Sequence, residues 1–121
     1  MTIRANKYPV CDSIPVQHVL VSVFDKTDLD ILVNGIRSVN RNVMFYSTGG
    51  TGVKIKDILV DDAQFNYTYI EDFTRLPEME GGLVKTLHPK IHAGLLGERG
   101  NPEHIRYLEQ TMKDITGSPG V

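Results

Sequence analysis

The chain has 121 residues and a mass of 13.5 kDa, with 40% hydrophobic and 23% charged residues, which suits one globular domain. A formal net charge of −2 gives no electrostatic reason to expect nucleic acid or an anionic membrane as a partner, and no apolar run is long enough to span a bilayer. The N-terminus lacks the apolar core of a signal peptide, and a single cysteine, Cys11, excludes an internal disulfide, so we expect a cytoplasmic protein.

The first part of the chain predicts an irregular arm followed by a strand and a helix. Residues 1–17 lack periodicity, and residues 18–121 are expected to form one domain. Residues 18–24 are a nearly continuous apolar run, typical of a strand buried on both faces of a parallel sheet. Thr27 and Asp30 then resemble a capping box that begins a helix. Apolar residues follow at helical spacing until about Asn40: Leu29, Leu32, Val33, Ile36 and Val39.

The same pattern repeats along the next thirty residues. Residues 43–46 predict a second strand, residues 47–51 a turn, and the residues up to about Val60 a shorter helix. Residues 65–70 predict a third strand, in which Tyr67 and Tyr69 are expected to be packing residues. This order of elements predicts an α/β fold with three layers, α/β/α, around a mostly parallel sheet.

The remainder of the chain is less regular. Residues 71–92 have little periodicity, and a long loop of this kind is usually functional or disordered. Residues 93–96 predict a short strand. Asn101 and Pro102 begin a last helix with Ile105, Leu108 and Met112 on one side, before a turn-like tail.

Two turns predict a site for a phosphate group. Residues 22–27 place Lys26 and hydroxyl groups at a helix N-terminus, where unpaired backbone N–H groups and the helix dipole favour an anion. Residues 47–51 offer three hydroxyl groups and two glycines that allow an anion to approach backbone amides. For each turn considered alone, a purely structural role is the alternative to phosphate binding: Thr27 would be a plain N-cap, and Gly49–Gly50 would form a tight turn. Both turns should emerge at the carboxyl edge of the sheet, where ligands of α/β proteins bind.

The segment GGLVKTLHPKIHAGLL, residues 81–96, has an unusual composition for a core element because it combines glycines, a lysine and two histidines. Lys85 is the residue of this segment that is best suited to act on a ligand. The alternative is that Lys85 is an ordinary solvated surface lysine. His88 and His92 are four residues apart, but Pro89 argues against a helix that would bring them together. We therefore expect hydrogen-bonded structural histidines and no metal site.

These motifs resemble those of the methylglyoxal-synthase-like IMP cyclohydrolase domain found in the bifunctional purine enzyme AICAR formyltransferase/IMP cyclohydrolase. The similar segments are VLVSVFDKT (residues 19–27), STGGT (47–51), FTRLPEM (73–79) and, most densely, GGLVKTLHPKIHAG (81–94). They cover residues 18–100 in order and with similar spacing.

The resemblance implies specific roles. Ser22, Lys26 and Thr27 correspond to a first phosphate-binding turn, and a second is made of Thr48, Gly49, Gly50 and Thr51. Lys85 falls on the active-site lysine, which helps to bind and polarise the formamide or carboxamide region of the substrate, and Thr86 on a neighbouring ligand contact. The implied ligand is formyl-AICAR or a purine nucleotide monophosphate. The resemblance implies a homodimer and no cofactor.

The sequence also departs from the family pattern. Leu83 stands in place of an arginine, Phe24 in place of a second serine, and Asp28 where a glycine often follows Asp-Lys-Thr. The family's later blocks, with a tyrosine in Asn-Leu-Tyr-Pro-Phe and an aspartate in Asp-Ile-Gly-Gly, do not occur in these 121 residues. Two hypotheses follow: a truncated or divergent IMP cyclohydrolase, or a non-catalytic regulatory module that binds a phosphorylated metabolite.

Overall fold

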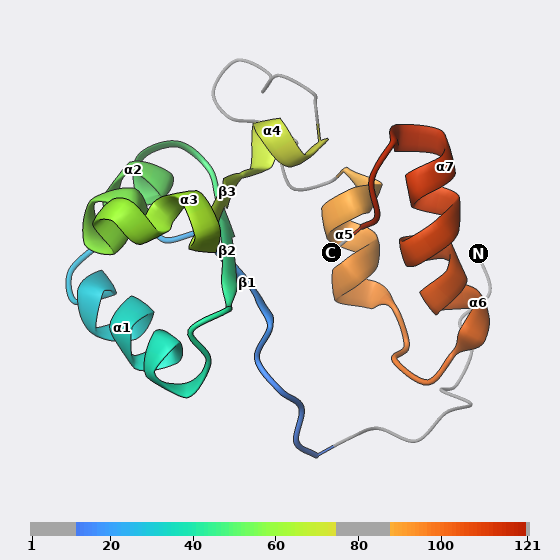
Figure 1. Cartoon of the computed structure of the whole chain (residues 1–121), viewed down its shortest axis with the longest axis horizontal. Helices are drawn as coiled ribbons and strands as arrows, with labels where there is room; N and C mark the ends of the chain where they lie inside the picture. Colours follow the sequence, from blue (N-terminus) through green and yellow to red (C-terminus); the bar gives the residue numbers. More distant parts are fainter. Residues whose placement is uncertain (1–11, 75–87, 121) are drawn as a thin grey trace. The chain divides into compact units, whose positions relative to one another are not determined.

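The computed structural model describes residues 12–74 and 88–120, which form two compact units (Figure 1). The first unit comprises residues 15–74, and the second comprises residues 88–120 with residues 12–14. Among these residues, no helix is both long enough and apolar enough to cross a membrane.

A parallel sheet forms the centre of the first unit. Its strands are β1 (His18–Val21), β2 (Met44–Ser47) and β3 (Tyr67–Tyr69), in the spatial order β1-β2-β3. In the register, Phe45 of β2 lies between Val19 and Tyr67. The α/β class and the parallel sheet predicted from the order of elements are therefore confirmed.

Two crossover helices cover one face of this sheet (Figure 1). They are α1 (Leu29–Val39), between β1 and β2, and α2 (Gly49–Leu59), between β2 and β3. Their placement on one face agrees with right-handed crossovers between adjacent strands. The core between the helices and the sheet is formed by Val21, Leu29, Val33, Val43, Phe45, Ile55, Leu59 and Tyr67.

The third strand is shorter than predicted because helical turns surround it. The 3₁₀ helix η1 (Val60–Asp62) and the helix α3 (Ala63–Asn66) precede β3, and α4 (Ile70–Thr74) follows it. Asn66 fixes the position of this turn because its buried Nδ2 donates to the carbonyls of Arg41 and Val43, both at 2.8 Å. The first strand likewise ends at Val21 rather than at Phe24, and His18 at its start is exposed, so burial on both faces is not observed.

The capping box predicted at the start of α1 does not form. The helix begins at Leu29 after Asp28, which makes no side-chain cap hydrogen bond. The Thr27 amide and hydroxyl instead donate to Asp25 Oδ1, at 2.9 and 2.6 Å. Asp28 has a φ of 61°, in the left-handed region that favours glycine. A glycine, which the family pattern often has at this position, would adopt this φ without strain.

The substitution Asp28→Gly should stabilise the chain by about 0.5–1 kcal/mol, because relief of left-handed strain exceeds the backbone entropy that glycine costs. Urea unfolding followed by circular dichroism measures this change. Asp30→Gly is the matched control, since it removes the same charge from the first turn of α1 at a helical position. It should destabilise the chain, and equal losses for both variants would contradict the strain at Asp28.

The second unit begins with α5 (Pro89–Leu96), so the strand predicted at residues 93–96 is wrong. The expectation that Pro89 opposes a helix is also wrong, because proline occupies the first turn, where its missing N–H is not needed. His88 caps the helix by accepting a hydrogen bond from the Lys90 amide at Nδ1, 3.1 Å away. Partial burial and the positive charge of Lys90 lower the pKa of His88.

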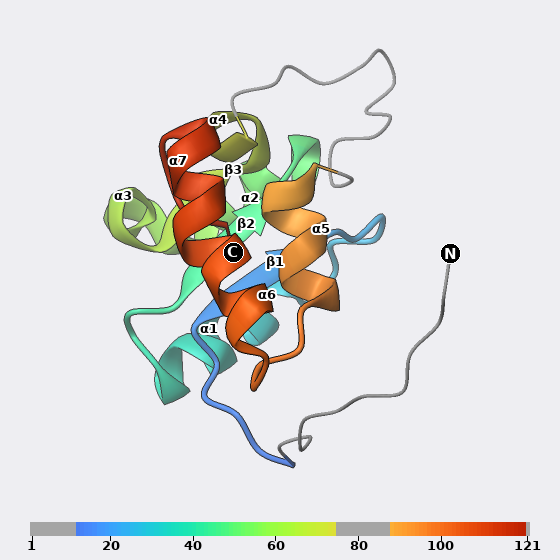
Figure 2. The same ribbon diagram turned by 90° about the vertical axis from the view of Figure 1, so that its right-hand side faces the viewer.

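A long helical segment packs beside α5 (Figures 1 and 2). It runs through α6 (Pro102–Arg106), the π-helical turn η4 (Tyr107–Thr111) and α7 (Met112–Thr116), and it ends at Gly117 with a φ of 90°. The predicted start at Asn101 is confirmed, since its side chain accepts from the Glu103 and His104 amides. The tail returns to α5, where the buried Lys90 ammonium donates to the Ser118 hydroxyl.

Candidate functional site

The two predicted phosphate turns meet at the carboxyl edge of the sheet. Because β1 and β2 are adjacent and parallel, residues 22–28 and the start of α2 emerge side by side. The Thr51 hydroxyl donates to the Val23 carbonyl at 3.0 Å and so links one turn to the other. A methyl group at Gly50 would lie 3.5 Å from Cε of Lys26 and 3.9 Å from its Nζ. The structure therefore brings Lys26 against the second turn.

Lys26 is held in this position by its own loop. Its ammonium group donates to the carbonyls of Val23 and Phe24, at 3.2 and 3.1 Å. These contacts are exposed, so the ammonium group remains accessible to a ligand in solvent. Ser22 and Phe24 in the same turn are also exposed, and the Phe24 ring is fully so.

Thr27 is engaged within the first turn. Its amide and hydroxyl both donate to Asp25, and these hydrogen bonds, followed by the charge of Lys26, hold the pKa of Asp25 below its usual range. Asp25 is consequently ionised at neutral pH. In this arrangement the Thr27 hydroxyl supports the loop, and a ligand would have to displace Asp25 to use it.

The second turn presents a helix N-terminus without a side-chain cap. Thr48 occupies the N-cap position of α2 but makes no side-chain cap hydrogen bond, and Gly49 has a φ of 51°. The first turn of α2 contains no acidic residue. The positive end of the helix dipole and the first-turn N–H groups at Gly49 and Gly50 therefore face an exposed edge that can accept an anion.

Two hydroxyl groups of this turn are buried. Thr51 is 6% exposed, and its hydrogen bond to Val23 gives it a structural role in joining the turns. Ser47 is completely buried, and its hydroxyl has no hydrogen-bond partner among the residues that the structure describes. The Ser47 carbonyl accepts the Tyr67 hydroxyl at 3.3 Å, which ties the end of β2 to β3. Burial raises the pKa of Tyr67, so this phenol stays protonated.

The remaining predicted residues, Lys85 and Thr86, lie outside the described residues, as does Leu83. Ser22, Lys26, Thr27, Thr48, Gly49, Gly50 and Thr51 all belong to the two adjoining turns. Within the described ranges, no group of three or more histidine, cysteine, aspartate or glutamate side chains is arranged to bind a metal ion.

Sequence comparison with curated proteins identifies clear relatives, although no protein-family model matches the chain. The chain is 41% identical over 96 residues to the bifunctional purine biosynthesis protein PurH of Mycobacterium leprae. It is 43% identical, also over 96 residues, to the protein of the same name from Rhodospirillum rubrum. Each match covers 79% of this chain and 17% of the relative, so the chain corresponds to a small part of those proteins. The chain is therefore homologous to the N-terminal, IMP cyclohydrolase-type region of bifunctional PurH, as its motifs predicted.

Proposed function

We propose that the two turns bind the phosphate group of a purine nucleotide monophosphate or of its precursor formyl-AICAR. The observation that supports this most directly is the position of Lys26 against Gly50, beside the uncapped N-terminus of α2. A phosphate there would receive backbone N–H donors, the helix dipole and the lysine charge together. Gly49 and Gly50 leave the backbone accessible to its oxygens.

We further propose that the chain is an IMP cyclohydrolase-type domain of purine biosynthesis, acting in the cytoplasm as a homodimer. In this reaction the carboxamide nitrogen of formyl-AICAR attacks the formyl carbon, and a C–N bond closes the purine ring. The formyl oxygen leaves as water, with two protons supplied by the two nitrogens. Lys85 would polarise the formyl or carboxamide oxygen on which negative charge develops, and Thr86 would contact the ligand beside it.

The similarity to PurH over 79% of the chain supports this proposal. The GGLVKTLHPKIHAG segment, which contains Lys85, supports it as well. The alternative is a non-catalytic module that binds a phosphorylated metabolite or a purine nucleotide. Leu83, which stands where the family pattern has an arginine, favours this alternative, because a fork-shaped donor that could hold the ligand is absent there.

Turnover of formyl-AICAR to IMP by the 121-residue chain, followed by absorbance and chromatography, separates the two functions. An enzyme should form IMP, and Lys85→Ala should reduce the rate at least ~100-fold, the order of magnitude expected for loss of one charge-stabilising donor. Lys113→Ala, which removes an exposed charge from α7, should leave the rate unchanged.

Calorimetric titration with IMP completes the experiment. Binding without turnover would support the module and reject the enzyme. Failure of both IMP and inorganic phosphate to bind would reject the proposed site itself. Sedimentation of the same samples tests the proposed homodimer.

A further inference from the structure

A polar pocket lies at the opposite end of β2 from the two turns. Its walls come from the end of α1, the turn before β2, η1 and α3, and its lining residues are Arg37, Arg41, Asn42, Asp62, Phe65 and Asn66. Its volume is about 330 Å³, which suits a small molecule. Because the two turns follow the carboxyl ends of β1 and β2, this pocket is separate from the proposed nucleotide site.

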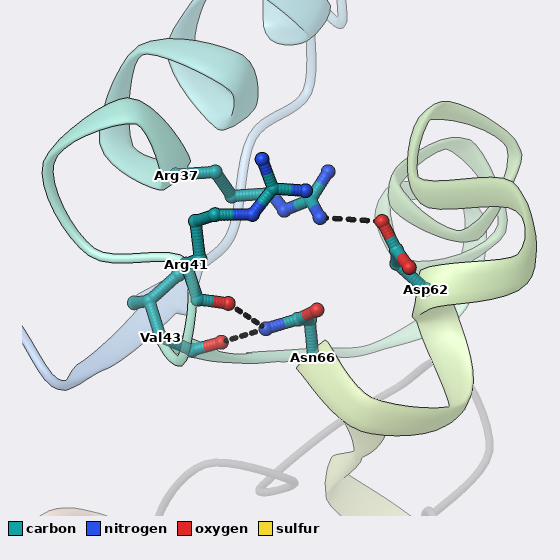
Figure 3. Close-up of polar contacts among 5 residues, drawn as sticks. All are labelled: Arg37, Arg41, Val43, Asp62 and Asn66. Carbon is teal, nitrogen blue, oxygen red and sulfur yellow. Dashed lines mark hydrogen bonds and ion pairs between the residues drawn. The ribbon is translucent and has the colours of Figure 1, made fainter.

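The backbone of the pocket is fixed by contacts that need no ligand (Figure 3). Arg37 Nη2 lies 2.5 Å from Asp62 Oδ2 and joins the end of α1 to η1. Asn66 Nδ2 donates to the carbonyls of Arg41 and Val43, which holds the turn before β2. A preformed wall of this kind lowers the entropy lost when a ligand binds.

The charges of the pocket are not balanced. Two guanidinium groups, those of Arg37 and Arg41, lie beside one carboxylate, Asp62 (Figure 3). Asp62 pairs with Arg37, and within the described part of the chain Arg41 takes part in no ion pair. Among the described residues, the buried Nε atom of Arg37 has no hydrogen-bond partner, so its single pair with Asp62 does not satisfy the whole guanidinium group. This local excess of positive charge occurs on a chain whose formal net charge is −2.

We propose that this pocket binds a small metabolite through a carboxylate or phosphate group held by Arg41 and flanked by Arg37. A guanidinium group offers parallel N–H donors that match the oxygens of either group. Phe65, which is 68% exposed, would cover the apolar part of the ligand. Asp62 limits the affinity by competing for Arg37 and by repelling the anion.

Titration of the 121-residue chain with malonate and, separately, with inorganic phosphate tests this site. Calorimetry measures affinity, and the ¹⁵N–¹Hε NMR signals of the arginines report which side chains respond. Arg41→Ala should weaken binding roughly tenfold or more, as loss of a charged hydrogen-bonding partner does. Arg99→Ala removes the same charge from an exposed position in the second unit and should have no effect. Asp62→Asn should strengthen binding several-fold, because it releases Arg37 and removes a negative charge.

Two further comparisons distinguish this site from the proposed nucleotide site. Lys26→Ala should leave malonate binding intact, and Arg41→Ala should leave IMP binding intact. In the Lys26→Ala background, binding of malonate alone identifies a carboxylate ligand, and binding of phosphate alone identifies a phosphate ligand. If neither anion binds, or if Arg41→Ala binds as tightly as Arg99→Ala, the proposal is wrong.

Discussion

The substitution Gly52→Ala should destabilise the chain by about 2 kcal/mol or more, because the added methyl group overpacks a tight contact. Gly52 is buried in α2 and faces Tyr67 and Tyr69 of β3. A Cβ atom there would collide with the Tyr67 hydroxyl, and it would lie only 2.9 Å from Cε1 of Tyr69 and 3.2 Å from Cζ of Tyr67. Tyr67 is part of the buried core and its hydroxyl donates to the Ser47 carbonyl, so its ring cannot move aside without loss of packing and of this hydrogen bond.

Urea unfolding followed by circular dichroism measures the loss, since the chain has no tryptophan for fluorescence. Gly35→Ala in α1 is the matched control, because a methyl group there meets nothing within 4 Å. It should stabilise the chain by about 0.5–1 kcal/mol through its helix propensity. If both alanines stabilise, the close packing of α2 on β3 is refuted.

A double-mutant cycle identifies the atoms responsible. Tyr67→Phe alone removes the hydrogen bond to the Ser47 carbonyl and should be destabilising. In the Gly52→Ala background, the same change also removes the nearest colliding atom. The double variant should therefore lose less stability than the sum of the two single changes.

Much of the first unit could be predicted because its elements follow from apolar periodicity. The apolar residues at the start of β1, in α1 and in β2 locate those elements to within a few residues. The second unit was harder to predict from the sequence. Residues 93–96 form a short apolar run, and periodicity alone cannot assign such a run to a strand or a helix. The prediction that Pro89 argues against a helix was also wrong. Proline disrupts the interior of a helix, but it is well suited to the first turn, which is where Pro89 lies in α5.

The candidate site was predictable as a set of turns, whereas the internal contacts of those turns were not. Hydroxyl groups, glycines and Lys26 mark the two turns in the sequence, but the pairing of Thr27 with Asp25 depends on a local loop conformation. The burial of Thr51 depends on a contact with Val23, 28 residues away. The pocket at Arg41 could not be predicted from the sequence, because its charge balance depends on the pairing of Arg37 with Asp62, 25 residues away. The roles of Lys85 and Thr86 stay predictions.

Lys26→Ala should weaken IMP binding roughly 10- to 100-fold, because a charged hydrogen-bonding group contributes about 1.5–3 kcal/mol to such a contact. Lys26 is the cation that the structure holds against Gly50 at the start of α2, so it would be in place before the ligand arrives. The variant should keep the stability of the parent chain, since the hydrogen bonds lost are exposed ones to the carbonyls of its own loop.

Calorimetric titration at fixed ionic strength measures this effect, with Lys54→Ala as the charge-matched control. Lys54 is exposed on the same helix, α2, so both variants lose one positive charge from the chain. A general electrostatic attraction would weaken IMP binding similarly in the two variants, whereas a direct phosphate contact affects Lys26→Ala alone. Adding salt should weaken binding more in the parent than in Lys26→Ala, because the screened interaction is the one that the variant has already lost. Equal affinities for the two variants would show that the phosphate group does not bind beside Lys26.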